Sequence, residues 1–262
     1  MKIARINVNG KTQHALVEEK SLRLIRGDIF GDWEKTGQTV PLDQAKLLAP
    51  VESRQIVAIG LNYRKHAEES GMPIPDHPLI FIKTPNCVVG QGDSILLPKM
   101  APAEVDYECE LVIVIGKEAK HVSVADAPGH VFGYTCGNDI SARDCQLKQD
   151  KQWARGKCFD TFAPIGPWIE TELDYDRAGI RLKVNDELRQ NSNTSDLIFP
   201  CMELVSYISQ CMTLYPGSII MTGTPSGVAL GKKPPCFLKK GDVVTVEIDG
   251  IGALINPVQK EY

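Results

Sequence analysis

Short apolar runs recur along most of the chain, and their lengths are typical of β-strands. They lie at residues 55–60, 79–82, 111–115, 131–136, 180–184, 218–222 and 243–248. Apolar runs of about four to eight residues between turn residues predict buried strands. Helical spacing is clear at residues 201–212, which follow Pro200 and in which Val205, Ile208 and Met212 recur. We therefore expect a mixed α/β fold that is β-dominated and has few helices.

The first 50 residues differ from the rest in having short strands joined by tight turns. Asn9-Gly10 separates the run at residues 6–8 from the run at 15–17, and this dipeptide between two such runs predicts a hairpin. Residues 41–50 begin and end with proline, as expected at a boundary. We therefore expect a small N-terminal β-rich domain at residues 1–50 and a larger domain at residues 51–262.

Composition and charge exclude several classes of function. The 262 residues are 43% hydrophobic and 24% charged, which is typical of a globular protein. A net charge of −4 argues against a general nucleic-acid binder, because phosphate contacts call for a basic face. No apolar stretch approaches the roughly 20 residues that cross a bilayer, and the N-terminus has no signal-peptide pattern, so we expect a cytoplasmic location and no membrane partner. The eight cysteines form no Cys-x-x-Cys pair, which indicates reduced, buried thiols.

Two glutamates precede the most apolar run of the chain. Glu108 and Glu110 lie two residues apart beside residues 111–115, and strand side chains two apart point the same way. An unpaired buried carboxylate is costly or loses its charge, so we expect a metal ion or a basic side chain to meet them. Asp106 shares their face in an ideal strand and is a rival ligand, although its place near the strand start favours a solvated or loop-bonding role.

Asp139 follows another apolar run and is a candidate third ligand. Three carboxylates with water suit Mg²⁺ or Mn²⁺, whereas the sequence lacks the His and Cys spacings that suit zinc. The alternative is that these acids form salt bridges with Arg143, Arg155 or Lys157. Lys157 has apolar and aromatic neighbours in the sequence, so a buried, paired ammonium is consistent with either interpretation.

Residues 62–71 predict a short helix, with Asn62 as its N-cap and Gly71 as its terminator. His66 and Glu69 are three residues apart and share one face of this helix, so the carboxylate can orient the imidazole for general base catalysis. The alternative is a solvated helix with ion pairs four residues apart, Arg64 with Glu68 and Lys65 with Glu69. The proline-rich residues 72–78 that follow predict a stiff loop, which is either a lid or an inert connection.

The strand at residues 219–222 leads into a glycine-rich turn at residues 223–227. Backbone N–H groups and threonine hydroxyls in such a turn can hold an anionic group. The turn lacks the lysine and the glycine spacing of nucleotide-binding loops, which argues against a nucleotide.

Together these motifs resemble the fumarylacetoacetate hydrolase family over about residues 56–256. The resemblance rests on six motifs in the order of the family: Gly60-Leu61-Asn62-Tyr63 with His66 and Glu69, Phe81-Ile82-Lys83-Thr84-Pro85, Glu108-x-Glu110, Asn138-Asp139 with Ser141-Ala142-Arg143-Asp144, Gly156-Lys157 with Phe159-Asp160-Thr161, and Thr222-Gly223-Thr224-Pro225-x-Gly227. The chain lacks the long N-terminal domain of the animal enzyme. It is more similar to the short members, which include acylpyruvate hydrolases and oxaloacetate decarboxylases and tautomerases.

The resemblance implies a fold, a cofactor and roles for individual residues. It implies a homodimer whose β-roll or barrel-like catalytic domain holds Mg²⁺ or Mn²⁺, with a small-molecule 2-oxo acid as substrate. The implied metal ligands are Glu108, Glu110 and Asp139, and the implied catalytic residues are His66, Glu69 and Lys157. The residues implied around the bound carboxylate and the metal shell are Arg143, Gln146 and Thr224.

We expect a hydrolase that cleaves the C–C bond of a 2,4-dioxo acid through a metal-bound pyruvate enolate. In this hypothesis His66, helped by Glu69, takes a proton from water, and Lys157 faces the developing enolate. One alternative uses the same site for oxaloacetate tautomerisation or decarboxylation, or for a hydroxymuconate-type isomerisation. The other is a non-catalytic binding protein that keeps the metal as a structural clamp.

Overall fold

The computed structural model describes all residues from 1 to 262, and its main element is a twelve-stranded sheet. Ten strands form a path in the order β4-β3-β2-β1-β14-β12-β11-β17-β6-β7. Their bounds are β4 Trp33–Pro41, β3 Ser21–Gly27, β2 Lys11–Glu18, β1 Lys2–Val8, β14 Ala163–Glu170, β12 Val131–Asn138, β11 Cys109–Ile115, β17 Ile219–Met221, β6 Ile56–Gly60 and β7 Leu79–Lys83. β5 (Lys46–Leu47) pairs with β1, and β8 (Val88–Val89) pairs with β14.

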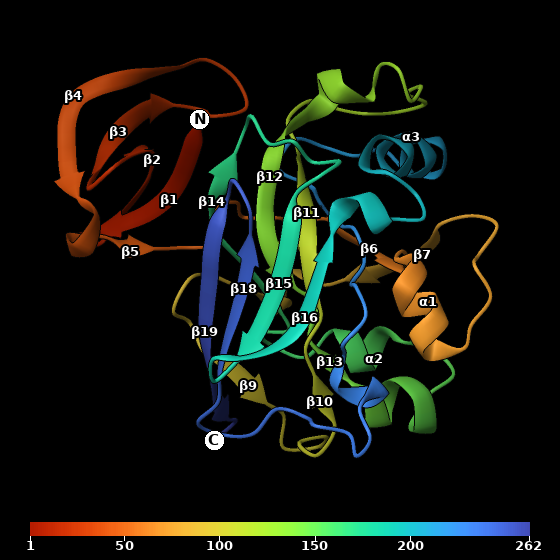
Figure 1. Cartoon of the computed structure of the whole chain (residues 1–262). Helices are drawn as coiled ribbons and strands as arrows, with labels where there is room; N and C mark the ends of the chain where they lie inside the picture. The colour runs from red at the N-terminus through yellow and green to blue at the C-terminus, as the bar shows by residue number, and fades with distance from the viewer.

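A second, five-stranded sheet packs against the middle of the first. Its order is β16-β15-β18-β19-β9, with bounds Glu187–Asn193, Gly179–Val184, Val243–Ile248, Gly252–Lys260 and Ile95–Leu97. β15 contacts β11, β18 contacts β12, and β19 contacts β14, and Figure 1 shows these strands side by side. The two sheets enclose the main core, in which every residue of β11 is buried. A small pair, β10 (Val105–Asp106) with β13 (Ser141–Ala142), lies beside them.

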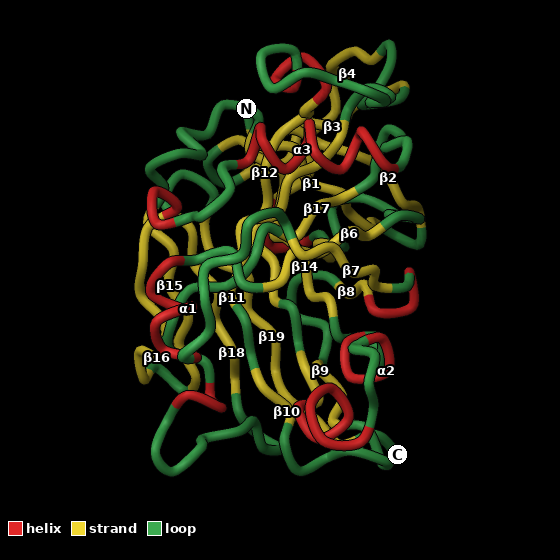
Figure 2. The backbone as a smooth tube through the Cα atoms, turned by 90° about the vertical axis from the view of Figure 1, so that its right-hand side faces the viewer, coloured by secondary structure: helices red, strands yellow, loops and turns green.

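Helices are few and lie outside the sheets. They are α1 (Arg64–Ser70), α2 (Ala154–Lys157) and α3 (Cys201–Cys211), with short helical turns at Leu42–Gln44, Pro85–Cys87, Ala127–His130, Asp144–Gln149, Thr194–Asp196 and Ala229–Gly231. Figure 2 shows them around the strands, with α2 toward the end of the molecule that carries the C-terminus. None of the helices is both long enough and apolar enough to cross a bilayer. The prediction of a mixed, β-dominated fold with few helices is confirmed.

The first strands form a lobe that projects from one end of the main sheet (Figure 1). Asn9-Gly10 joins β1 to β2 as predicted, and both residues have positive φ angles, as a tight hairpin requires. Five buried residues form a small core of their own in this lobe: Ala4, Ile6, Ala15, Leu22 and Leu24. Hydrogen bonding is continuous with the rest of the chain, however, because Lys2 and Ile3 of β1 pair with β14. The division at residue 50 stays a prediction.

Two local predictions need correction. Asn62 is not the N-cap of α1, because Tyr63 occupies that position and the Asn62 side chain bonds elsewhere, donating to the Thr222 carbonyl at 2.7 Å and accepting from the Phe199 N–H at 2.8 Å. Gly71 does terminate α1, in a left-handed conformation. All eight cysteines are free thiols, but only five are buried, and Cys211 is exposed.

Candidate active site

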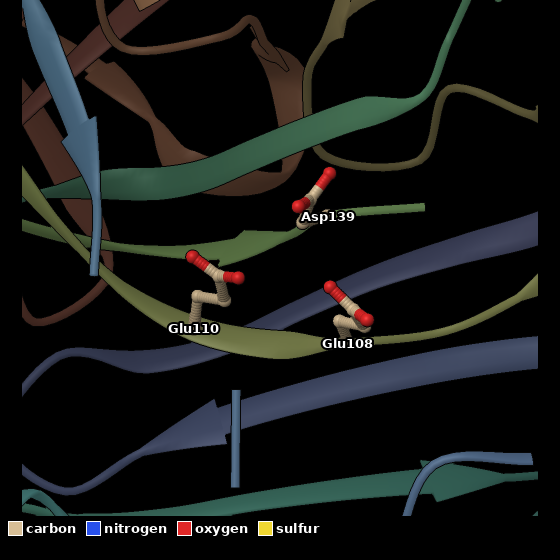
Figure 3. Close-up of side chains that lie close together, drawn as sticks. All are labelled: Glu108, Glu110 and Asp139. Atoms are coloured by element: carbon tan, nitrogen blue, oxygen red, sulfur yellow. The ribbon is translucent and has the colours of Figure 1, made fainter. Parts of the chain in front are cut away.

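Adjacent strand ends bring the three predicted carboxylates together. Glu108 immediately precedes β11, Glu110 lies within it, and Asp139 immediately follows β12, the antiparallel neighbour of β11. The Asp139 N–H donates to the Glu108 carbonyl at 2.9 Å, which fixes the two segments side by side. All three side chains are buried, and one oxygen of each lies within 4.8 Å of the others. Figure 3 shows the two glutamates on one segment of the chain and Asp139 on the neighbouring segment.

Three buried cations surround this trio. The Lys157 ammonium donates to Glu108 Oε2 at 2.8 Å and to Asp139 Oδ2 at 2.6 Å. Arg143 Nη2 donates to Glu108 Oε1 at 2.6 Å, and Lys83 Nζ donates to Asp139 Oδ1 at 2.6 Å. Salt bridges from Arg143 and Lys157 are therefore present, as the alternative interpretation expected. Arg155 is not part of the cluster, because it pairs with Asp150.

Glu110 is the member of the trio that no cation meets. Its carboxylate accepts one hydrogen bond, from the Gly223 N–H at 2.9 Å, and forms no ion pair. Burial, and then the charges of Asp139 and Glu108, raise its pKa well above the ordinary value. Burial also opposes ionisation of Glu108, but the charges of Lys157 and Arg143 outweigh it and lower the pKa of that carboxyl to about 2.

The donor set fits a divalent cation. Its three carboxylates offer only oxygen, the ligand that Mg²⁺ and Mn²⁺ prefer. Each carboxylate has about four lone-pair sites, so Glu108 and Asp139 can keep their bonds to Lys157 and still coordinate a metal. A cation at Glu110 would also relieve the repulsion that raises the pKa of this residue. The buried trio could therefore hold a divalent metal ion.

Asp106 is buried and takes the loop-bonding role that its position favoured. Its carboxylate accepts from Arg143 Nε at 2.9 Å and from the backbone N–H groups of Ala229 and Leu230 at 2.7 and 3.1 Å. The backbone between β10 and β11 is not an ideal strand, so Asp106 does not join the trio. Instead it ties Arg143 to the loop at residues 228–231.

Arg143 and Gln146 form a hydrogen bond with each other beside the carboxylate trio. Arg143 Nη1 donates to Gln146 Oε1 at 2.9 Å, while Arg143 Nε and Nη2 bind Asp106 and Glu108. Two of the five guanidinium N–H groups and the Gln146 amide N–H groups are left for other acceptors. Burial opposes the charge of Arg143, but Asp106 and Glu108 raise its pKa above the ordinary value.

Thr224 is oriented by a residue that the sequence did not indicate. The buried Gln190 in β16 donates through Nε2 to Thr224 Oγ1 at 2.8 Å and to the Pro225 carbonyl at 2.7 Å. Because the hydroxyl oxygen accepts this bond, its own hydrogen remains available to a ligand oxygen. Thr224 itself is buried and faces the cavity.

His66 and Glu69 form the predicted pair on α1. His66 Nδ1 lies 3.2 Å from Glu69 Oε2, and both Glu69 oxygens accept from the Gly227 N–H at 3.0 Å. Burial opposes the ionisation of Glu69, but the bonds from His66 and Gly227 outweigh it and lower the pKa of this carboxyl. The ion pairs of a solvated helix do not form, and Arg64 instead donates to the Leu197 carbonyl at 2.6 Å.

One cavity of about 650 Å³ brings these groups together. It is lined by seven of the nine predicted site residues: His66, Glu69, Glu108, Arg143, Gln146, Lys157 and Thr224. Glu110 and Asp139 lie outside the lining, and Asp139 is joined to it through the Lys157 ammonium. Met72, Pro73 and Pro75 of the proline-rich loop also line the cavity, so this loop borders the site.

Two buried residues of the site were missed by sequence reasoning. Lys83 is 1% exposed and donates both to Asp139 and to the Lys157 carbonyl, so it positions two site residues at once. The sequence carried a signal for it, because Lys83 directly ends an apolar run. Gln190 carried none, since it lies in the polar stretch at residues 185–193.

Comparison with family models gives two matches that together span most of the chain. Residues 55–259 match the model described as fumarylacetoacetate (FAA) hydrolase C-terminal. Residues 1–50 match the model described as Rv2993c-like, N-terminal.

Similar proteins include several oxaloacetate tautomerases. The mitochondrial oxaloacetate tautomerase Fahd2a of Rattus norvegicus is 44% identical over 223 residues, which cover 84% of this chain and 71% of that protein. The fumarylacetoacetate hydrolase domain-containing protein 2 homolog of Dictyostelium discoideum is 49% identical over 233 residues, covering 84% of this chain and 76% of that protein. The Rattus norvegicus relative is named as mitochondrial, and the cytoplasmic location expected for this chain stays a prediction.

Solved structures of similar proteins share the fold over the whole chain. The 5-carboxymethyl-2-hydroxymuconate delta-isomerase of Mycobacterium smegmatis has a TM-score of 0.91 at 39% identity and covers 100% of both chains. The 2-hydroxyhepta-2,4-diene-1,7-dioate isomerase of Mycobacterium marinum has a TM-score of 0.90 at 39% identity, covering 100% of this chain and 99% of that one. With the family model matching residues 55–259, the chain belongs to the fumarylacetoacetate hydrolase family.

Proposed function

We propose that this protein is a divalent-metal-dependent isomerase that interconverts the enol and keto forms of 2-oxo acids. The observation that carries the proposal is that the His66–Glu69 pair lines the same cavity as Glu108 and Lys157, which belong to the carboxylate–lysine cluster. Proton transfer next to a site that stabilises negative oxygen is what a keto–enol conversion requires. The relatives named as oxaloacetate tautomerases and hydroxymuconate isomerases support the same class of reaction.

The buried charges would bind and orient the oxo-acid end of the substrate. Glu108, Glu110 and Asp139 would hold Mg²⁺ or Mn²⁺, which supplies positive charge to the substrate oxygens when it is bound. Lys157 brings a fixed ammonium to the same end, because its bonds to Glu108 and Asp139 hold it in place. The Thr224 hydroxyl and the Gln146 amide would donate to the carboxylate of the substrate.

His66 would move the proton between carbon and oxygen of the substrate. The Glu69 carboxylate accepts from Nδ1, which leaves the lone pair of Nε2 free to take a proton from the enol oxygen and then return it to the substrate carbon. The Gly227 N–H holds Glu69 in turn, so the imidazole is oriented by a fixed partner. The lowered pKa of Glu69 keeps this carboxylate ionised near neutral pH.

A second candidate is the hydrolysis of a C–C bond in a 2,4-dioxo acid. The same free imidazole nitrogen could take a proton from water, and the cavity of about 650 Å³ has room for a longer substrate with that water. Relatives named as tautomerases and isomerases favour the first candidate.

The test mixes the purified protein and Mg²⁺ with enol oxaloacetate and, in a separate assay, with an acylpyruvate. Loss of the enol absorbance of oxaloacetate, without release of pyruvate or CO₂, is the expected result. Cleavage of an acylpyruvate to pyruvate at a higher kcat/KM than the enol conversion would favour hydrolysis. CO₂ release at the rate of enol loss would indicate a decarboxylase, and no reaction with either substrate would contradict the proposal.

We also propose that the protein acts as a homodimer, as the family resemblance implied. Light scattering coupled to size-exclusion chromatography tests this directly. A mass near twice the 28.8 kDa of the chain is expected, and a mass of one chain at micromolar concentration would contradict it.

A further inference from the structure

Much of the cavity lining outside the predicted site residues is apolar, and we call this part of the lining the apolar chamber. Outside the predicted site residues, its lining includes Ile59, Leu61, Met72, Leu79, Phe81, Leu147, Trp153, Val228 and Leu230. Lys233 is the only charged residue in this part of the lining, and it is exposed at the surface. A substrate that is held by its oxo-acid end would therefore extend among hydrocarbon and aromatic side chains.

The apolar wall starts directly at the reacting end. The Lys157 ammonium lies 5.1 Å from the centre of the Phe81 ring, a cation–π distance. The Phe81 ring in turn contacts the edge of Trp153, with 5.5 Å between ring centres and an angle of 75° between planes. The two aromatic rings thus lead outward from the lysine that would face the substrate oxygens.

Gly60 allows Trp153 and Leu79 to complete this wall. A Cβ atom at Gly60 would lie 2.8 Å from the Trp153 ring and 2.9 Å from the Leu79 side chain, closer than real contacts allow. The absence of a side chain at residue 60 therefore lets the indole lie against the end of β6. Phe81, Trp153 and Leu79 form one continuous surface, which we call the aromatic wall.

Several side chains around this chamber are exposed although they are large and apolar. Leu147 is 54% exposed, Met72 53%, Leu79 42% and Leu230 38%, and all four line the cavity. Exposed apolar side chains that converge on one concavity are typical of a binding site for an apolar group. Burying them against a substrate would remove apolar surface from water, which favours binding.

The chamber does not match a small dicarboxylate such as oxaloacetate. A cavity of about 650 Å³ lies within the range of about 300–1,000 Å³ that holds drug-sized ligands. A second carboxylate placed beside Phe81 and Trp153 would find the indole N–H of Trp153 as the one ring donor to replace its bonds to water. Outside the predicted site residues, the only charged side chain of the lining is Lys233, which is exposed.

We propose that the preferred substrates are 2-oxo acids whose far end is an aromatic or branched aliphatic group that packs on the aromatic wall. This inference rests on the proposed 2-oxo-acid function and specifies its substrate class. The metal-binding end selects the oxo acid, and the aromatic wall selects the substituent.

The test compares the enol-to-keto conversion of phenylpyruvate with that of oxaloacetate by the same Mg²⁺-loaded protein. We expect kcat/KM for phenylpyruvate to be at least about tenfold higher, since apolar groups in a fitting pocket give factors of about 10–200. A higher kcat/KM for oxaloacetate would overturn the substrate assignment while leaving the proposed function intact. Failure of both conversions would instead remove the proposed function.

Substitutions of Trp153 test whether the aromatic wall causes the preference for phenylpyruvate over oxaloacetate. Trp153→Ala should lower kcat/KM for phenylpyruvate about tenfold or more and change that for oxaloacetate less than about threefold, which also shows that the variant folds. In the milder variant Trp153→Leu, kcat/KM for phenylpyruvate should lie between the values of the wild type and of Trp153→Ala. An equal loss for both substrates in Trp153→Leu, with an unchanged melting temperature, would overturn the role of the wall.

Lys233→Gln tests the opposing interpretation, in which the chamber binds a second carboxylate. We expect less than about a threefold change for either substrate, because the ammonium is exposed. A loss of about tenfold for oxaloacetate alone would show that Lys233 holds a distal carboxylate and would overturn the proposal.

Discussion

The two ends of the cavity are built in opposite ways. At the inner end, Glu108, Asp139 and Lys157 are nearly without solvent exposure, and Lys157 pairs with both carboxylates. At the outer end, the lining residues Leu79 and Leu147 are apolar and more than 40% exposed. The inner end is suited to fixing reacting oxygen atoms, and the outer end to accepting a substituent by size and polarity.

The difference indicates which substitutions each end of the cavity should tolerate. Removing one member of a buried ion pair leaves the other charge unpaired and costs several kcal/mol of stability. We therefore expect few substitutions to be tolerated at the inner end. An exposed apolar side chain can be exchanged at small cost, because such surface substitutions usually alter stability by less than about 0.5 kcal/mol. The comparison predicts large, substrate-independent losses from inner substitutions and selective losses from outer ones.

Glu110→Gln should give the largest effect. The amide keeps the size of the side chain but removes the charge that no other cation meets, so we expect kcat/KM to fall about 10³-fold or more for oxaloacetate and phenylpyruvate alike. Titration calorimetry should show loss of Mg²⁺ binding in the same variant. Activity within about tenfold of the wild type would contradict the assignment of Glu110 as a ligand.

Lys157→Met should cost about 10²–10³-fold in kcat, because it removes a fixed positive charge from the reacting end. Arg155→Met is the matched control, since Arg155 carries the same charge two residues away but pairs with Asp150 outside the cluster. We expect the control to stay within about threefold of the wild type. Equal losses in the two variants would mean that local charge rather than position matters.

His66→Ala should lower kcat about 10²-fold, toward the lower end for a general base, because enols of 2-oxo acids also convert without an enzyme. His77→Ala serves as the control, since His77 does not line the cavity and stacks on Tyr207 instead. A loss below about tenfold in His66→Ala would remove the proton-transfer role from this residue. Imidazole in the buffer should partly restore the variant if the role is correct.

Glu69→Gln should give the smallest effect. The effect should appear in the way the free energy of unfolding depends on pH. The folded-state pKa of Glu69 lies below the ordinary value of 4.5, so its ionised form stabilises the fold fully above about pH 4.5. This stabilisation is lost as the pH falls through the folded-state pKa. The free energies of unfolding of wild type and variant, measured in urea, should therefore differ most near neutral pH and become equal in acid. A difference that does not change with pH would contradict the assigned hydrogen bonds.

Much of the inner end could be predicted from sequence because its signals are local. Glu108 and Glu110 lie at the start of one strand, and Asp139 follows a strand whose apolar run was clear, so alternation and strand ends placed all three. Helical spacing placed His66 and Glu69 on one face, but it left a solvated helix as the alternative, and the family resemblance implied their role. Asp106 shows the limit of this reasoning, because a break in the strand between β10 and β11 turns its side chain toward Arg143.

The outer end could not be predicted in the same way. Its wall combines Gly60, Leu79 and Phe81 of an edge pair of strands with Trp153, which precedes a short helix. Each is an ordinary apolar residue or glycine in its own segment, and only the tertiary packing brings them together. Gln190 was missed for the same reason, since its partner Thr224 lies 34 residues further along the chain.

A metal titration tests the central claim, that buried carboxylates and a bound cation drive a 2-oxo-acid isomerase. Protein treated with chelator is mixed with freshly dissolved enol oxaloacetate, and loss of the enol absorbance is followed as Mg²⁺ is added back. The account predicts a rate near the uncatalysed background in chelator and a saturable return of activity with Mg²⁺. Full activity in the presence of chelator would contradict it.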